Sequence, residues 1–421
     1  MKIAVYGINY APELTGIGKY TGEMATWFAE QGHEVHVITA MPYYPEWKVH
    51  EKYRRKLWFS EQINGVKVFR CPLYVPKKIT PLRRIIHEFS FLLSVLPVWL
   101  LSFFKRRYDL LICITPPFHL GILPLIYSKV RGTPLISHVQ DLQVDAAKNL
   151  VMIKSSRLLN LMFGAERFIL KRSAAVSTIS KGMLKKITDK NVPVASTILF
   201  PNWVDANFIR PLSPEESLRK EFGIPLEDKV ILYSGNLGEK QGLNIIIDVA
   251  REFRDKKNVH FLIVGSGGNK QTLQQLAKDS NLDNLKFFPL TEYAKLPALL
   301  AVADLHLVLQ KKSASDLVMP SKLTGILAAG GCPVVTAEPG TSLFEIIQNN
   351  NIGILVKPEC PKSLKESLEQ ALETDLSDLK LNAREFAVRH LSKHFVMQKF
   401  EEDAYKTQTP GIEFIYQQLY V

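Results

Sequence analysis

The strongest constraint on the fold is that one local pattern occurs twice. Near the N-terminus, the strand-like run "KIAVYG" leads into a loop with Gly16 and Gly18, and an amphipathic helical pattern follows. A second strand-like run, "KVILYSG", leads into another glycine-rich loop and helical pattern. Glycine permits positive φ and a close approach of ligand to backbone, and helix N-termini attract anions. The sequence therefore predicts two β-loop-α openings that suit anionic ligands.

Strand-like and helical patterns alternate through both halves of the chain. The first half contains "EVHVIT", "VKVFRC", "DLLICIT", "PLISHVQ", "AAVSTIS" and "STILFPN", and the second contains "VHFLIVG", "LKFFPL", "DLHLVLQ", "PVVTA" and "IGILVK". Between the halves, at residues 200–216, periodicity fades and prolines gather. This alternation predicts an α/β protein with two doubly wound, Rossmann-like domains that face a central cleft. We assign residues 1–204 and 205–390 to these domains, and expect residues 391–421 to pack back on the first.

Composition points to a globular cytoplasmic protein. Hydrophobic residues make up 46% and charged residues 22% of the 421, as in soluble proteins generally. The four cysteines are far apart and fit no metal spacing, so we expect reduced thiols and no metal site. The opening "MKIAVYGINYAPE" turns polar too soon for a signal peptide.

The positive charge is concentrated in one stretch. The net charge is +12, and residues 48–107 hold fourteen Lys or Arg against three Asp or Glu, a local balance of +11. No nucleic-acid recognition motif accompanies it. The stretch includes the apolar run "IIHEFSFLLSVLPVWLLSFF", residues 85–104, flanked by basic residues. This run is compatible with a helix buried in the domain, a face on an anionic membrane surface, or a membrane span.

The second half carries three motifs for an anion. "YSGNLGEKQGL" combines a glycine-rich loop with Lys240, which suits a diphosphate. "MPSKLTGILAAGG" places Lys322 in the first turn of a predicted helix, where a cation opposes the helix dipole and is therefore suspected of binding a ligand. "AEPGTSLFEII" predicts another helix N-terminus, with Thr341 or Ser342 as its cap and Glu345 close behind.

The first half offers fewer chemical candidates. "SHVQDLQVD" places His138 and Asp141 at the end of a buried strand, where doubly wound folds hold functional residues. A buried core histidine with satisfied hydrogen bonds is the alternative interpretation for His138.

Six stretches together resemble one enzyme family. They are "YAPELTGIGKYTGEMATWFAEQGHEVHVIT", "HVQDL", "LFPNWVD", "YSGNLGEKQGL", "IVGSGGNKQTL" and "MPSKLTGILAAGGCPVVTAEPGTSLFEII". In this order they cover essentially the whole chain and resemble the retaining glycosyltransferases of family four, which have the GT-B fold. Within that family the likeness is to bacterial exopolysaccharide enzymes of the colanic-acid type.

The resemblance implies roles for individual residues. In such enzymes the donor nucleotide-sugar lies against the second domain and the acceptor against the first, and no metal is required. His138 and Lys322 are then catalytic, with His138 near the reacting sugar carbon, and Asp141 and Tyr10 lie on the acceptor side. The donor-binding residues implied are Gly16, Gly18, Asn236, Lys240, Gln241, Asp316, Ser321, Gly340, Thr341, Ser342 and Glu345.

The chain departs from the family pattern at four places. Asn236 and Gln241 stand where many relatives have Arg and Lys. Leu317 and Gly325 stand where they have a pair of glutamates, of which the second, at the Gly325 position, holds the ribose. We therefore expect Lys240 and Lys322 to neutralise the diphosphate, and Asp316 to take over a glutamate's role.

The predicted function is transfer of a sugar, with retention, from a nucleotide-diphosphate-sugar to a polyprenyl-diphosphate-linked exopolysaccharide repeat. We expect the enzyme to lie on the cytoplasmic face of an anionic membrane, with no cofactor, no metal and no nucleic acid. A nucleotide-sugar epimerase of the same architecture and a non-catalytic membrane-surface protein are the alternatives.

Overall fold

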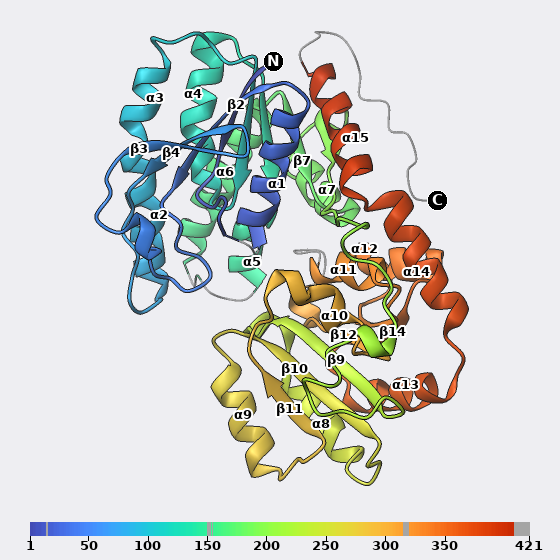
Figure 1. Cartoon of the computed structure of the whole chain (residues 1–421). Coiled ribbons are helices and arrows are strands. Elements are labelled where there is room, and N and C mark those ends of the chain that lie inside the picture. Colours follow the sequence, from blue (N-terminus) through green and yellow to red (C-terminus); the bar gives the residue numbers. More distant parts are fainter. Residues whose placement is uncertain (14–15, 150–152, 154, 315–319, 408–421) are drawn as a thin grey trace. The chain divides into compact units, whose positions relative to one another are not determined.

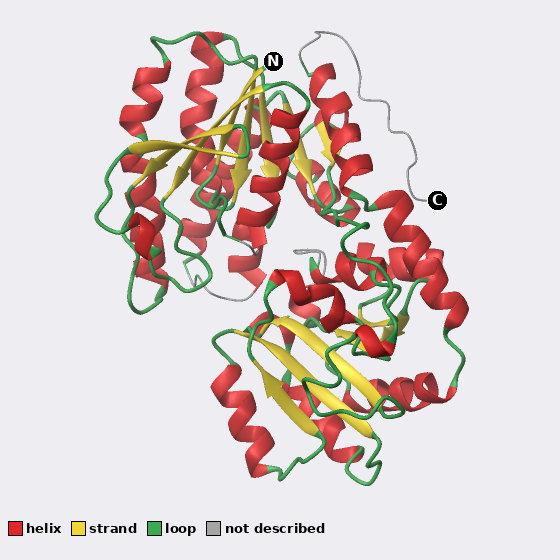
Figure 2. Ribbon diagram, viewed as in Figure 1, coloured by secondary structure: helices red, strands yellow, loops and turns green. Residues whose placement is uncertain are grey.

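The computed structural model describes residues 1–407 apart from 14–15, 150–152, 154 and 315–319 (Figure 1). The described chain groups into two compact units. Of the described residues, the first contains Met1–Phe200 and residues 397–407, and the second contains Pro201–Val396. Each unit is an α/β layer structure with its own sheet (Figure 2), as predicted.

The first unit is built on an eight-stranded sheet with the order β3-β4-β2-β1-β5-β6-β7-β8. All neighbouring strands are parallel except the β3–β4 pair. The order reverses between β1 and β5, which creates the switch point where doubly wound folds bind ligands. The strands are β1 Lys2–Tyr6, β2 Glu34–Ala40, β3 Phe59–Ile63, β4 Val66–Cys71, β5 Leu110–Thr115, β6 Leu135–Val139, β7 Ala175–Thr178 and β8 Thr197–Leu199.

Amphipathic helices cover this sheet. On the first helix Tyr20, Met24, Trp27 and Phe28 recur at helical spacing and are all buried, which confirms the amphipathic helix predicted after the first glycine loop. The helices are α1 Gly16–Glu30, α2 Pro81–Ser94, α3 Leu96–Ser102, α4 Ile122–Arg131, α5 Gln143–Asn149, α6 Ser156–Arg172 and α7 Lys181–Thr188, and part of α15 Lys393–Lys406 joins them.

The predicted apolar segment 85–104 is two helices rather than one. α2 begins at Pro81, Val95 separates it from α3, and Pro97 lies in the first turn of α3. Pro97 has no amide N–H to donate to the Leu93 carbonyl four residues back, and the first turn of a helix tolerates that loss, which explains why a new helix begins here. Phe91, Val95 and Trp99 on one face are at most 2% exposed and pack in the core of the first unit.

The second unit repeats the architecture with a six-stranded parallel sheet of order β11-β10-β9-β12-β13-β14. Its switch point lies between β9 and β12. The strands are β9 Lys229–Asn236, β10 Val259–Ser266, β11 Leu285–Phe288, β12 Leu305–Val308, β13 Pro333–Thr336 and β14 Ile354–Val356. The helices are α8 Asn244–Glu252, α9 Lys270–Asp279, α10 Leu296–Leu300, α11 Lys322–Ala328, α12 Ser342–Asn350, α13 Pro361–Glu373 and α14 Ser377–His390.

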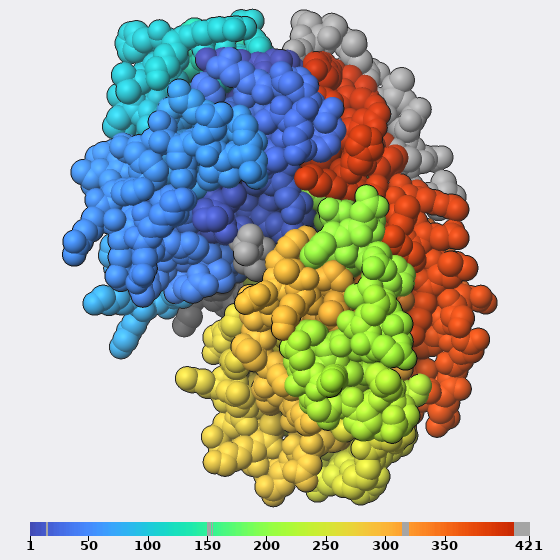
Figure 3. Space-filling view, viewed as in Figure 1, coloured from blue at the N-terminus to red at the C-terminus, as the bar shows by residue number. Residues whose placement is uncertain are grey.

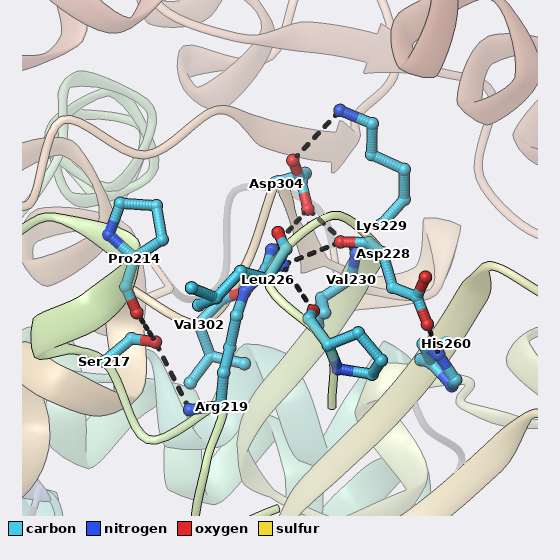
Figure 4. Close-up of polar contacts among 11 residues, drawn as sticks. Pro214, Ser217, Arg219, Leu226, Asp228, Lys229, Val230, His260, Val302 and Asp304 are labelled. Carbon is cyan, nitrogen blue, oxygen red and sulfur yellow. Dashed lines mark hydrogen bonds and ion pairs between the residues drawn. The ribbon is translucent and has the colours of Figure 1, made fainter. Parts of the chain in front are cut away.

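A buried arginine anchors the chain where the second unit begins. Arg219 is 4% exposed, and its guanidinium donates to the Val302 carbonyl at 3.0 Å and to the Asp304 carboxylate at 2.8 Å (Figure 4). The same carboxylate accepts from the Val230 amide at 2.9 Å. These contacts lie at the amino ends of β9 and β12, the edge opposite to the carboxyl ends where ligands bind. We therefore assign this network a structural role and no part in ligand binding.

Candidate functional site

The candidate site in the second unit begins at the carboxyl end of β9. Gly235 has a φ of 136° and Gly242 a φ of 62°, conformations that side chains with a Cβ rarely adopt. Lys322, the first residue of α11, lies over this loop, because a Cβ at Gly235 would be 3.3 Å from Lys322 Nζ. The structure therefore brings together the glycine loop and the lysine that the sequence singled out separately.

Lys322 is held in an unusual electrostatic environment. Its Nζ is buried, lies 3.3 Å from the centroid of the Tyr233 ring, and has no hydrogen-bond partner among the described residues. Burial lowers the pKa of Lys322 well below its usual value. A buried ammonium without a counter-charge is strongly unfavourable. An anion over the Gly235 loop would supply the missing partner.

Polar side chains line the rest of the loop. A Cβ at Gly238 would lie 2.8 Å from Gln241 Oε1 and 3.0 Å from Asn236 Nδ2, so both side-chain amides lie close to this glycine. Gln241 Oε1 is buried and has no hydrogen-bond partner in the described part of the chain. Lys240 is half-buried and anchors Lys311 through the bond from Lys311 N to Lys240 O, 2.9 Å long.

A second helix N-terminus lies at the same edge of the sheet. Thr341 caps α12 by accepting from the Phe344 amide at 3.4 Å, and Gly340 before it has a φ of 81°. The predicted cap is thus Thr341, while Ser342 is 7% exposed and Glu345 is exposed. Because β13 precedes this helix and is parallel to β12, the amides of α12 point to the edge that carries the Gly235 loop.

Ser321 and Gly325 lie at the start of α11 and within it. Ser321 stands at the N-cap position of α11 but makes no capping bond with its side chain. Gly325 faces Ile209 and Leu300, since a Cβ there would lie 3.7 Å from a methyl group of each. A glutamate at this position would therefore point at apolar side chains. Asp316, which we expect to take over a glutamate's role, and its neighbour Leu317 lie outside the described residues.

The candidate loop of the first unit follows β1 and surrounds a buried carboxylate. Glu13 is 3% exposed and accepts from the amides of Tyr43 and Tyr44 at 3.0 and 2.9 Å, and from Asn9 Nδ2 at 2.9 Å. Burial raises its pKa against the opposing effect of these bonds. A Cβ at Gly18 would lie 2.7 Å from this carboxylate, and Gly16 has a φ of 60°. Both glycines are thus required for local geometry.

His138 lies at the end of β6 with both ring nitrogens engaged. Gln140 Nε2 is 2.8 Å from His138 Nε2, and Ser177 Oγ is 2.9 Å from Nδ1. An amide nitrogen only donates, so Nε2 accepts and Nδ1 donates to the serine. Burial lowers the pKa of His138 to about 3, which keeps the ring neutral. At 1% exposure the ring contacts protein on all sides, and its contact with a sugar stays a prediction.

The two acceptor-side candidates differ in exposure. Tyr10 is 1% exposed and lies under the Arg70 guanidinium, 5.6 Å from its ring centroid, and burial raises its pKa. Asp141 is half-buried just after Gln140 and before α5. Their roles toward an acceptor stay predictions.

Sequence reasoning missed the supporting residues of both loops. Glu13 lies inside the stretch quoted for the first loop, seven residues after β1 ends at Tyr6, and a glutamate in a loop gives no signal of its own that it will be buried. Tyr233 lies within β9 and supports Lys322, but an aromatic residue in a strand is too common to suggest this role.

The arrangement in the second unit can bind and stabilise an anion. It presents a buried cation, a glycine loop that a ligand can approach, and the amide end of α12. In the described chain, no three His, Cys, Asp or Glu side chains gather closely enough to hold a metal ion.

Both halves of the chain match glycosyltransferase family models. Residues 15–203 match the model described as "Glycosyl transferase 4-like domain", and residues 214–387 match the one described as "Glycosyl transferases group 1". The colanic acid biosynthesis glycosyl transferase WcaI of Escherichia coli (strain K12) is 43% identical over 416 residues, which cover 96% of this chain and 99% of that protein.

Solved structures share the fold at low identity. Sucrose-phosphate synthase from Thermosynechococcus elongatus has a TM-score of 0.74 at 15% identity and covers 96% of this chain and 98% of its own. HepE from Anabaena, solved with UDP and glucose, has a TM-score of 0.71 at 16% identity and covers 96% and 100%. The predicted fold class and family are thus confirmed: the chain belongs to the GT-B glycosyltransferases that join a glycosyl transferase 4-like domain to a group 1 domain.

Proposed function

We propose that this glycosyltransferase moves a sugar from a nucleotide-diphosphate-sugar to a growing, lipid-linked exopolysaccharide repeat, with retention and without a metal or cofactor. The observation that carries the donor class is the buried Lys322 ammonium over the Gly235 loop, which has no partner among the described residues. A diphosphate has the charge and the oxygen acceptors that this site lacks.

The proposed chemistry relies on stabilising the leaving group. As the bond between sugar and diphosphate breaks, negative charge grows on the phosphate oxygen. Preorganised donors and a cation in a water-poor site stabilise such charge by several kcal/mol, on the order of 3 kcal/mol for one donor. With the leaving group stabilised in this way, front-face attack needs no protein nucleophile. Retention follows because the acceptor enters on the face from which the diphosphate leaves.

Two relatives support the substrate classes. WcaI is named for the biosynthesis of colanic acid, an exopolysaccharide. HepE was solved in complex with UDP and glucose. We extend both to this chain as the proposed product and donor classes. The comparisons give no support to the epimerase or to the non-catalytic alternative.

We further propose that the enzyme acts at the inner face of the plasma membrane as a peripheral protein. By length and composition, α2 and α3 together pass as a candidate span, but their inner face packs on the sheet. Their outer face leaves large apolar side chains in solvent: Leu82, Leu93, Leu100 and Leu101 are 59–68% exposed, and Phe104, two residues beyond α3, is 88% exposed. Figure 3 shows residues 48–107, in blue and light blue, over a broad area of the first unit.

The deciding experiment incubates the protein with a panel of UDP- and GDP-sugars, with and without a polyprenyl-diphosphate-linked glycan. We expect one donor to be consumed much faster with the acceptor, in EDTA as in buffer, and proton NMR of the product to show the donor's anomeric configuration. Interconversion of donors without an acceptor would indicate an epimerase. No consumption of any donor, with or without added Mg²⁺ or Mn²⁺, would contradict the proposal, and activity that needs a metal would contradict its metal independence.

A further inference from the structure

A cavity of about 360 Å³ lies in the first unit and is lined by residues between Met41 and Lys77, which precede α2. Five cations line it: Lys48, Arg54, Arg55, Lys56 and Lys77. No acidic residue is among its lining residues. Its remaining walls are mostly apolar, and include Met41, Trp47, Val49, Leu73 and Val75.

The five cations have little compensation within the protein. Among the described residues, none of them forms an ion pair within 4.0 Å, and Lys56 instead stacks on Phe59, 4.7 Å from its ring centroid. Glu61 contacts the lining residue Tyr53, but its carboxylate is already bound by Arg70 Nε at 2.8 Å. The cavity therefore has a strong positive potential, and an anion would fit it better than any neutral ligand.

The cavity wall is built into the domain. Trp47 packs against Tyr43 and His87, with ring centroids 5.5 and 5.2 Å away. Trp47 and Arg55 have φ values of 52° and 65°, which bulky side chains rarely adopt and which often mark functional positions. Backbone bonds from Lys48 N to Tyr43 O, 3.2 Å, and from Arg54 N to His50 O, 3.1 Å, hold these residues in place.

Exposed apolar residues flank the cations on both sides. Leu57 and Trp58 follow Lys56 and are 65% and 50% exposed, and Ile79 lies two residues beyond Lys77 and is 55% exposed. The Trp58 indole donates to the Ser94 carbonyl at 2.7 Å, which fixes this segment beside the C-terminus of α2. A ligand whose anionic group enters the cavity thus meets apolar surface immediately outside it.

We propose that this cavity binds the diphosphate group of an isoprenoid lipid, the carrier of the acceptor glycan. The combination of five cations, an aromatic wall and an apolar rim fits an amphiphile with a diphosphate head better than a soluble anion. This inference rests on the proposed function for its biological meaning, but its binding test is independent of sugar transfer.

The probes are farnesyl diphosphate below its micelle-forming concentration, inorganic pyrophosphate, farnesol and phosphatidylglycerol vesicles, with affinity measured by titration calorimetry or co-sedimentation. Two double variants remove the same charge from the same stretch: K48Q/K77Q inside the cavity and K52Q/K78Q outside it. We expect K48Q/K77Q to weaken farnesyl diphosphate binding by about tenfold or more, while K52Q/K78Q leaves it near the wild-type value. Vesicle binding should fall equally in both.

Several outcomes would overturn the assignment. Equal weakening by the two double variants would reduce the site to general surface charge. Pyrophosphate binding as tight as farnesyl diphosphate binding would assign the cavity to a soluble anion, and farnesol binding as tight would leave the cations without a role. A protein that transfers sugar, but binds farnesyl diphosphate without regard to Lys48 and Lys77, would refute the cavity site alone. A protein that binds it as expected, but uses no donor, would refute the proposed function alone.

Discussion

Burial acts on two basic side chains in the same direction but with different consequences. It lowers the pKa of both Lys322 and His138. His138 has a hydrogen-bond partner on each ring nitrogen and is stable as a neutral ring. Lys322 has no such partner in the described chain and rests on the Tyr233 ring. The histidine is thus satisfied by its own domain, whereas the lysine is poised for a ligand.

Replacing Lys322 by Ala should weaken donor binding by ~1.5–3 kcal/mol, because a charge-assisted contact with phosphate is lost. Affinity of the wild type for UDP should also fall as pH rises through the lowered pKa of Lys322, since only the ammonium binds phosphate. Lys322→Arg, which stays charged, should remove this pH dependence. Calorimetric titration with UDP measures both effects. Lys362→Ala on exposed α13 is the control, and a Lys322→Ala protein with wild-type affinity would refute the assignment.

Replacing His138 by Ala should lower kcat more than it weakens UDP binding. The ring orients Gln140, so Gln140→Ala should give a similar kcat defect, which marks His138 as a positioning residue. Steady-state kinetics and UDP titration of both variants provide the test, with thermal unfolding as the control for folding. If UDP binding falls as far as kcat, His138 has a structural role instead, and a fully active Gln140→Ala would show that the ring does not act through Gln140.

The sequence identified the residues of the site better than their environments. The glycine loops and Lys322 were predicted because the spacing of glycines, and a lysine in the first turn of a helix, can be read directly from the sequence. The cation–π contact with Tyr233 and the carboxylate of Glu13 under Gly18 depend on side chains that meet only in the folded domain. Nor could the sequence decide whether His138 is buried or exposed, because residues at the ends of strands occur in both environments.

At the scale of single elements, the β3–β4 hairpin and the α2–α3 pair show where sequence patterns succeed and fail. β3 was not predicted, although Asn64 and Gly65, with φ values of 48° and 79°, form the kind of two-residue turn that joins hairpin strands. The polar run "FSEQI" hid the strand, since an edge strand has little need of apolar residues. The apolar run 85–104 was predicted, but its division at Val95 was not.

The exposed face of α2 and α3 should bind anionic membranes reversibly. Leu101→Ser combined with Phe104→Ser should weaken binding to phosphatidylglycerol vesicles by about tenfold or more, because two large apolar side chains no longer enter the lipid. Salt should weaken binding of the wild type, since each basic residue near the surface contributes ~1 kcal/mol that is screened. Co-sedimentation measures both effects.

The control is Leu381→Ser on α14, a leucine of similar exposure in the second unit. No preference for anionic over neutral vesicles at low salt would exclude a surface-binding face. Pelleting that resists alkaline carbonate would indicate that Pro81–Ser102 spans the membrane.

At the scale of the whole molecule, buried neutral histidines make stability depend on pH. Burial lowers the pKa of His138 and His306 to about 3, and that of His36 and His119 to about 4. In the unfolded chain a histidine titrates near 6.5, so below that pH the unfolded state binds more protons than the folded state. The stability that these residues contribute is complete above pH 6.5 and is lost as pH falls toward their folded values.

We therefore expect the free energy of unfolding to fall by about 1 kcal/mol for each fully buried histidine between pH 7.5 and 5.5. Urea unfolding at the two pH values measures this loss. His306→Gln should lose about 1 kcal/mol less than the wild type over this range, because an amide does not titrate. Equal losses in both proteins would show that His306 takes up no proton on unfolding.

The two-domain architecture was predictable from the sequence. The alternation of strand and helix patterns occurs in both halves of the chain, and a proline-rich segment separates the halves. The basic cavity at Trp47 was not predictable, because its cations come from separate turns whose positive φ values do not follow from residue type. Sequence patterns thus gave the scaffold and one of the two anion sites proposed above.

The lone ammonium of Lys322 also makes the protein's stability a reporter of its substrate. Most substitutions destabilise a protein, yet Lys322→Met should raise the melting temperature of the ligand-free protein, since it removes a buried charge that only the Tyr233 ring faces and that has no hydrogen-bond partner in the described chain. At this position the residue that binds the donor therefore lowers the stability of the ligand-free protein. The same imbalance means that the true donor, at about a hundred times its Kd, should stabilise the wild type by ~2.7 kcal/mol. A thermal-shift survey of nucleotides can then name the base before any acceptor is known.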